Sequence, residues 1–186
     1  MKFAFLLWSG MFLLNNSWNL SPSGSEVYST RDGKVALHFD LTIGQMEAHT
    51  QDVQSTLDVG TEAVIFTIQV KSFLFNNPIL EKQFKNVYME VDKFPETHFR
   101  GKIQGKIDFT TQAPQSTTVI GTLMMHGQSQ PKEIPATFTL EGEQVRVVSQ
   151  FPIRASEYGV TIPAAFFTHG KDEILVSIDV VYAKKS

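Results

Sequence analysis

The chain has 186 residues, of which 42% are hydrophobic and 19% charged, with a formal net charge of -3. This composition indicates one globular domain with a sizeable core and excludes an intrinsically disordered protein. No basic excess is available to neutralise a phosphate backbone, so nucleic acid is not an expected partner. The chain has no cysteine, which excludes disulfides, thiolate nucleophiles and cysteine-ligated metal sites.

Residues 1–20 are predicted to be an export signal. Lys2 supplies the positive start, and residues 3–14 form an apolar core that is too short to span a bilayer. Cleavage is expected between Ser17 and Ser25, although no small-x-small pair marks the site. An N-terminal membrane anchor and a buried strand are the alternatives. The mature domain is expected to cover residues 25–186, without a stable membrane span, in the bacterial periplasm or outside the cell.

The first half of the mature chain reads mainly as β-strand. Segments 26–29 and 34–43 are predicted to form a hairpin around Asp32-Gly33, because Asp-Gly between alternating runs is a strong turn signal. Residues 45–58 suggest a less regular, twisted strand, and residues 63–75 a further strand.

One short helix is expected after these strands. Asn77 is a favoured N-cap and Pro78 is favoured at the first helical position. Leu80, Phe84 and Val87 would then form one apolar face, so the helix should pack across the strands as a lid or plug.

The second half returns to strands. Segment 97–109 is predicted as one long strand whose apolar face carries Gly101 and Gly105, where the missing side chains leave room for a bend. Segments 117–126 and 132–140 form another expected hairpin, and strands at 144–154 and 173–182 follow. About eight evenly spaced strands favour a sandwich or an up-and-down barrel.

Several segments together resemble the YceI-like family of bacterial secreted proteins. The most specific are Pro95 to Phe99, with the pattern Pro-x-x-x-Phe, and Leu123 to Pro131, with the pattern Leu-x-x-His-Gly-x-x-x-Pro. Further similar segments are residues 71–75, 80–84, 88–90 and 156–160.

The resemblance implies an all-β fold: an eight-stranded antiparallel lipocalin-like barrel with one or two short helices and a long apolar cavity. It also implies binding of a polyisoprenoid or another long amphipathic lipid, with no catalytic residue and no cofactor. Many family members carry His just before the aromatic residue of the short helix, whereas this chain has Gln83. If that position meets a ligand's polar head, head-group preference differs here.

A lipid site of this kind needs apolar surface inside and polar groups only at its mouth. The expected cavity lining consists of apolar residues from the alternating segments and the helix: Phe39, Leu41, Phe66, Ile68, Leu80, Phe84, Phe99, Ile103, Leu123, Met125, Phe138 and Phe151. The expected mouth residues are Asn77, Glu81 and Gln83. The alternation by itself favours a solid core, and only the resemblance favours a cavity.

Other chemistry finds weak support. The five histidines have no HxH or HxxxH spacing, so no metal is expected, and His126 should hold the Gly127 turn. The chain has no GxSxG nucleophile elbow. Glu81 and Glu90 could pair as acid and base, but a Glu near a helix start is usually there for the helix dipole.

Four lysines could form a surface for an anionic head group or membrane, although simple solvation is favoured: Lys82, Lys85, Lys93 and Lys102. An enzyme acting on a lipid-like substrate in the same cavity remains an alternative, as does a structural module with a filled core. The sequence leaves open which lipid is bound, whether binding serves transport, storage or sensing, and whether the chain forms a homodimer.

Overall fold

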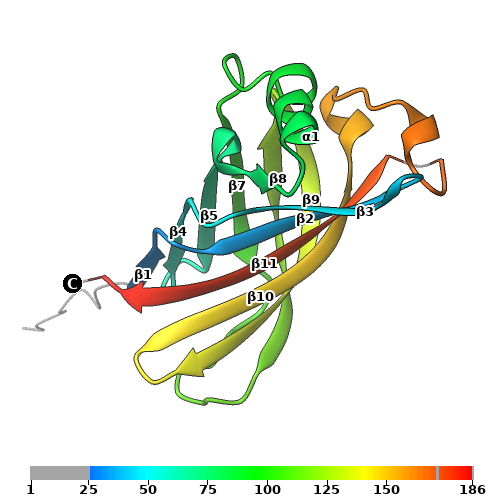
Figure 1. Ribbon diagram of the computed structural model, residues 1–186. Helices are drawn as coiled ribbons and strands as arrows, with labels where there is room; N and C mark the ends of the chain where they lie inside the picture. Colours follow the sequence, from blue (N-terminus) through cyan, green and yellow to red (C-terminus); the bar gives the residue numbers. More distant parts are fainter. Residues whose placement is uncertain (1–25, 171, 186) are drawn as a thin grey trace, which may run out of the picture.

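The computed structural model describes residues 26–170 and 172–185, so the expected signal at 1–20 lies outside the described residues (Figure 1). Within them the strands are β1 (Val27–Thr30), β2 (Lys34–Leu41), β3 (Gly44–Thr50), β4 (Val53–Asp58), β5 (Ala63–Gln69), β6 (Leu74–Phe75), β7 (Glu96–Ile103), β8 (Gln115–Met125), β9 (Gln128–Glu141), β10 (Gln144–Arg154) and β11 (Glu173–Lys184). The helical segments are η1 (Val70–Ser72), α1 (Pro78–Gln83), η2 (Phe84–Tyr88), η3 (Ala155–Tyr158) and η4 (Ala164–Phe166).

The strands close into an antiparallel barrel. The neighbour order β1-β4-β5-β7-β8-β9-β10-β11 forms a ring of eight, because β1 also pairs with β11. At one end of the barrel, β2 extends β1, β3 extends β4 and β6 extends β5. Val27 pairs with Asp58 and Val35 pairs with Thr50, which is one uninterrupted register. The eight-stranded antiparallel barrel that the family resemblance implies is therefore confirmed.

The predicted hairpin at Asp32-Gly33 is wrong. Within the described chain β1 and β2 do not pair with each other but follow one another along β11. Gly33 is buried, and a Cβ atom there would lie 2.2 Å from Cγ1 of Val180. The glycine therefore permits close packing rather than a chain reversal. The reversal comes later, between Leu41 and Gly44.

The strand predicted over residues 97–109 ends earlier, at Ile103, and Gly105 lies beyond it with a φ of +88°. Gly101 pairs with Gly121 on β8. A Cβ atom at Gly121 would lie 2.3 Å from the carbonyl oxygen of Arg100 and 2.7 Å from Cζ of Phe99. The two facing glycines thus make room for the Phe99 ring on the inner wall, as aromatic residues often cover glycines in sheets.

The helix begins as predicted. The Asn77 side chain accepts hydrogen bonds from the N–H groups of Ile79 and Leu80 at 3.0 and 3.2 Å. After Gln83 the α-helix widens into the π-helical turn η2. Because a π-helical turn holds an extra residue, it shifts the following side chains around the helix axis, and Val87 is 65% exposed rather than part of the predicted apolar face.

The β8–β9 hairpin is tighter than predicted. Met125 pairs with Gln128, so the loop consists of His126 and Gly127 alone, with φ of +51° and +74°. Positive φ at both positions is typical of a type I′ turn, whose twist matches that of the strands. The region predicted as one strand over 45–58 is likewise divided into β3 and β4.

One stretch of the barrel wall lacks a ladder. β9 and β10 pair only from Gln144↔Glu141 to Ser149↔Ala136. In the described chain, residues 128–135 of β9 and 150–154 of β10 are therefore not paired with each other. We call this stretch the seam.

Prolines occupy both edges of the seam. Pro131 and Pro135 lie in β9, where the ladder with β8 continues through both positions. Pro152 lies in β10, where the ladder with β11 continues. Along an antiparallel strand, successive N–H groups point alternately to the two neighbouring strands. At these three positions the N–H group would point into the seam, and proline has no N–H group to place there.

Side chains close the seam instead. Gln130 Nε2 donates to the carbonyl oxygen of Glu157 at 2.9 Å, and Lys132 Nζ lies 2.8 Å from the Glu157 carboxylate. His126 Nδ1 lies 3.3 Å from the carbonyl oxygen of Tyr158. The Tyr158 side chain is fully buried, and this burial raises its pKa. Segment η3 therefore bridges the two edges.

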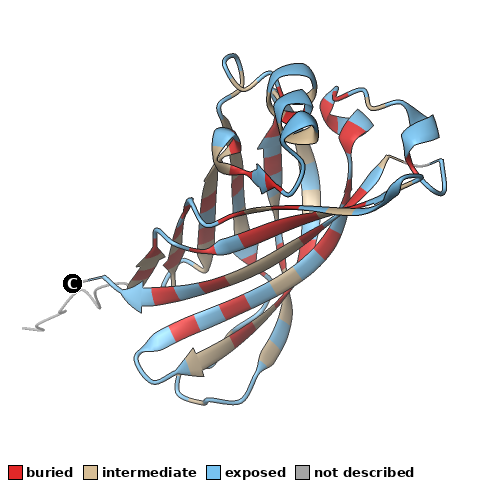
Figure 2. Cartoon of the chain, viewed as in Figure 1, coloured by how far each residue is buried: buried red, intermediate tan, exposed pale blue. Residues whose placement is uncertain are grey.

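Burial alternates along the strands, as a one-layer barrel requires (Figure 2). In β10 the odd-numbered residues Val145, Val147, Phe151 and Ile153 are buried and their even-numbered neighbours are exposed. The buried set forms one apolar core inside the ring. Segments α1 and 155–170 lie at the same end of the barrel, away from the C-terminus (Figure 1).

Candidate ligand-binding cavity

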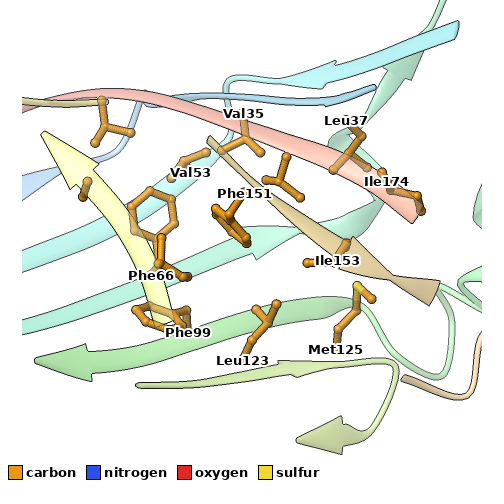
Figure 3. Close-up of a cluster of buried hydrophobic side chains, with 14 of the residues drawn as sticks. Val35, Leu37, Val53, Phe66, Phe99, Leu123, Met125, Phe151, Ile153 and Ile174 are labelled. Carbon is orange, nitrogen blue, oxygen red and sulfur yellow. The ribbon is translucent and has the colours of Figure 1, made fainter. Parts of the chain in front are cut away.

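The barrel encloses an apolar cavity of about 130 Å³, which we call the inner cavity. Its walls come from inward-facing residues of β2, β5, β7, β8, β9, β10 and β11, and η2 covers it. Phe66, Phe99 and Phe151 point into this interior from three strands (Figure 3). The predicted residues that line it are Phe39, Phe66, Ile68, Phe84, Phe99, Leu123, Met125, Phe138 and Phe151.

A second cavity of about 170 Å³, the outer cavity, lies between α1, the β2–β3 turn and residues 162–167. Three further predicted site residues contribute to it: Leu41, Leu80 and Gln83. The two cavities are neighbours, because four residues line both: Phe39, Phe84, Tyr88 and Ile162. A path from the open end of the barrel to its interior therefore passes these four side chains.

Three predicted site residues line neither cavity. Ile103 is buried in the core beyond the inner cavity. Asn77 uses its side chain to cap α1. Glu81 accepts hydrogen bonds from Lys85 at 2.7 Å and from the Phe75 N–H at 3.0 Å, and these bonds hold its pKa below the ordinary value. Glu81 thus ties the helix to β6.

The cover over the cavities is held by aromatic packing. The Phe84 ring lies 4.9 Å from that of Phe75 and 5.9 Å from that of Phe73, measured between centroids. Sequence reasoning missed Tyr88 and Met89 as lining residues. The segment Tyr88-Met89-Glu90 stood among the family landmarks, but the π-helical turn that directs its side chains inward has no signature in the sequence.

Polar groups on the cavity walls are few and neutral. They are Thr97, Ser149, Tyr88 and Tyr182 in the inner cavity, and Thr42, Gln83 and Tyr88 in the outer one. Among the described residues, none of the Asp, Glu, Lys, Arg or His side chains lines either cavity.

The deepest of these groups, Tyr182, has an internal partner. Its hydroxyl lies 2.7 Å from Oγ of Ser55, which donates onward to the carbonyl oxygen of Ile65 at 2.7 Å. Because a serine hydroxyl has one proton, Tyr182 is the donor in this pair. Burial raises the pKa of Tyr182, so its hydroxyl stays protonated and structural at neutral pH.

The histidines lie apart from one another. His98 contacts Thr67 and Glu96, while His126 contacts Glu90. In the described part of the chain no group of three or more His, Asp or Glu side chains is arranged to hold a metal ion. The same residues contain no helix with the length and apolar character needed to cross a membrane.

Solved structures share this architecture. A polyisoprenoid-binding domain from Saccharophagus degradans, implicated in plant cell wall breakdown, matches with a TM-score of 0.69 and 10% identity, over 87% of this chain and 99% of that one. BcnA of Burkholderia cenocepacia matches with a TM-score of 0.66 and 18% identity, over 81% of this chain and 96% of that one. A YceI protein of Campylobacter jejuni matches with a TM-score of 0.58 and 18% identity, over 75% of this chain and 84% of that one.

At such identities the likeness concerns the fold. No curated protein matches the chain. The model of the YceI-like domain, however, matches residues 18–182, which is nearly the whole sequence and includes β1 to β10 and most of β11. The chain therefore belongs to the YceI-like domain family.

Proposed function

We propose that this protein binds the tail of a long-chain isoprenoid or acyl lipid inside its barrel and sequesters or carries it in the periplasm or outside the cell. The observation that supports the proposal most is the pair of neighbouring cavities whose walls are almost wholly apolar. Each CH₂ group removed from water contributes about 0.8 kcal/mol, so such walls favour a hydrocarbon tail without any specific polar contact.

Each cavity alone is too small for a long lipid tail. An apolar cavity of about 150 Å³ holds a molecule such as benzene, whereas pockets for larger ligands span about 300–1,000 Å³. The inner cavity, at about 130 Å³, belongs to the first class. A long tail therefore has to join the two cavities, and it does so when side chains between them, such as Phe39, Phe84 and Tyr88, rotate aside.

The comparisons support the ligand class by analogy. The chain shares its family with YceI-like domains and its fold with the polyisoprenoid-binding domain of Saccharophagus degradans. Export rests on the signal-like residues 1–20. Binding rather than catalysis is favoured because, among the described residues, no Asp, Glu, Lys, Arg or His side chain lines either cavity. Burial raises the pKa of Tyr182, so its hydroxyl stays protonated at neutral pH and cannot act as a base.

A pair of neighbouring substitutions on β10 tests the cavity. Val147 lines the inner cavity, whereas Val148 is 39% exposed on the outer face. Val147→Phe should fill the cavity and reduce binding of a fluorescent fatty acid at least about tenfold. Val148→Phe adds the same ring outside and should bind as the parent protein does.

Circular dichroism and thermal unfolding would verify that both variants fold. Equal binding by a folded Val147→Phe variant would refute the cavity assignment. Native mass spectrometry of the exported protein, followed by organic extraction, would then identify the tail. A long-chain lipid at near-equal stoichiometry is the expected result.

A further inference from the structure

We infer that the lipid selected by this protein has an uncharged polar end, such as an alcohol or a carbonyl group, and that phosphate-bearing forms of the same tail are rejected. The inference rests on the proposed function, since it names the head group of a ligand that occupies the same cavities. It arises from the charges around those cavities rather than from their apolar walls.

The first observation is that the cavity walls offer no charged partner. Across both cavities the polar side chains are hydroxyl groups and the single carboxamide of Gln83. A phosphate that enters such a site loses its hydration without gaining a cation, which carries a large electrostatic cost. Proteins that hold phosphate supply Arg, Lys or free backbone N–H groups.

The second observation concerns the backbone donors of α1. Asn77 Oδ1 already accepts from the N–H groups of Ile79 and Leu80, and Pro78 has no N–H group. The N–H of Glu81 bonds the carbonyl oxygen of Asn77. The start of the helix therefore has no free donor with which to hold an anion.

The third observation concerns the cations nearest the opening. Lys85 lies 2.7 Å from the Glu81 carboxylate and is neutralised by it. Other lysines of the covering segments are exposed and line neither cavity: Lys71, Lys82 and Lys93.

Acidic groups lie on β2 and β3, whose connecting turn borders the outer cavity. Asp40, at the end of β2, accepts from the Thr168 hydroxyl at 3.0 Å, with the exposed His169 at 3.5 Å. Glu47 on β3 lies 3.4 Å from His38. These carboxylates line neither cavity, but they add negative charge near the β2–β3 turn, and like charges repel a phosphate.

The outer cavity instead suits a neutral head. Gln83 contributes a carboxamide there, and the hydroxyl groups of Thr42 and Tyr88 belong to the same wall. A carboxamide both donates and accepts, so it satisfies an alcohol or a carbonyl equally well. A tail in the inner cavity would place its polar end against these three residues.

The test compares two ligands with one tail, geranylgeraniol and geranylgeranyl phosphate, each titrated into the full mature protein by displacement of a bound fluorescent fatty acid. The alcohol should bind at least about tenfold more tightly than the phosphate. Gln83→Lys should reduce that preference at least about tenfold by adding a cation at the opening. Gln83→Leu should weaken alcohol binding without improving phosphate binding.

The control is Lys82→Gln, which changes charge on the same helix outside the cavities and should leave the preference unchanged. Equal or tighter binding of the phosphate by the parent protein would overturn the inference while leaving lipid binding intact. Failure of both ligands, together with failure of the fatty acid, would instead overturn the proposed function. Gln83 is exposed, so its replacement is expected to leave the fold intact.

Discussion

His126 Nε2 lies 2.9 Å from a carboxylate oxygen of Glu90, and both residues have positive φ, +51° and +43°. Positive φ is uncommon for residues other than glycine and costs free energy. The contact joins the segment after η2 to the turn of the β8–β9 hairpin. Because the same His126 ring also contacts the Tyr158 carbonyl, one side chain links the cavity cover, the hairpin and η3.

Replacing His126 should separate these contributions. His126→Ala removes both contacts but keeps the positive φ, so we expect the free energy of unfolding to fall by about 2–3 kcal/mol. His126→Asn tolerates the same backbone conformation better and should cost about 1 kcal/mol less. Urea denaturation measures both values. Equal losses in the two variants would show that the backbone conformation contributes little.

The facing glycines of β7 and β8 give a sharper steric prediction. Gly121→Ala would place a Cβ atom 2.3 Å from the carbonyl oxygen of Arg100, a backbone atom that cannot turn aside. We expect a loss of more than about 3 kcal/mol or failure to fold.

Gly142→Ala is the matched control, since it meets nothing within 4 Å and bears only the strain of a φ of +65°. We expect it to cost about 1 kcal/mol. A Gly121→Ala variant as stable as Gly142→Ala would mean that β7 and β8 lie further apart than the structure shows.

The cap of α1 should influence both stability and ligand exchange. Asn77→Ala removes the acceptor of two helix N–H groups and should cost about 1 kcal/mol. Since α1 borders the outer cavity, a less stable helix should also release bound fatty acid faster, which stopped-flow fluorescence measures. Asn76→Ala, at the exposed neighbouring position, should change neither quantity.

The outer surface carries a pair that should respond to acid. Arg146 holds Asp179 through two hydrogen bonds of 2.9 and 2.7 Å, and it lowers the pKa of Asp179 below its ordinary value. An unfolded Asp has a pKa of about 3.9, so the stabilisation is present above about pH 4 and is lost as the pH falls through the lower folded pKa.

Asp179→Asn should therefore unfold more readily than the parent protein at pH 7, and the difference should shrink toward pH 3. Urea denaturation at both pH values measures the two differences. A constant difference between the two pH values would show that the pair contributes through packing and not through charge.

The sequence predicted the overall fold because its evidence is repeated in every strand. Alternation placed residues such as Phe66 and Phe99 on the inner face, where both are buried, and the Asn77-Pro78 cap identified the helix start. The Asp32-Gly33 signal failed because glycine serves two purposes. Here it avoids a collision with Val180, on a strand almost 150 residues away, and no local pattern reveals such a contact.

The inward-facing strand residues could be predicted from their alternation along the sequence, whereas the residues at the mouth could not. Strand residues such as Phe66 and Phe99 could be placed on the inner face from alternation alone. Near the helix, polar character was taken as a sign of a mouth position, yet Asn77 and Glu81 serve the backbone of the helix and of β6. The seam, by contrast, has a signal in the sequence. Prolines at 131, 135 and 152, inside alternating runs, indicate strand edges.

The seam is also the place where the barrel can widen, which matters because its cavities are small. A continuous barrel widens only by breaking ladder hydrogen bonds, whereas residues 128–135 and 150–154 have none between them to break. Separating the two edges breaks the contacts of Gln130 and Lys132 with Glu157 and exposes nearby buried side chains. We therefore expect the wall to part at the seam more readily than elsewhere. The prolines of the seam also deny a neighbouring molecule the N–H groups needed to add a strand there. If the protein binds lipid as proposed, widening at the seam would admit tails of different thickness.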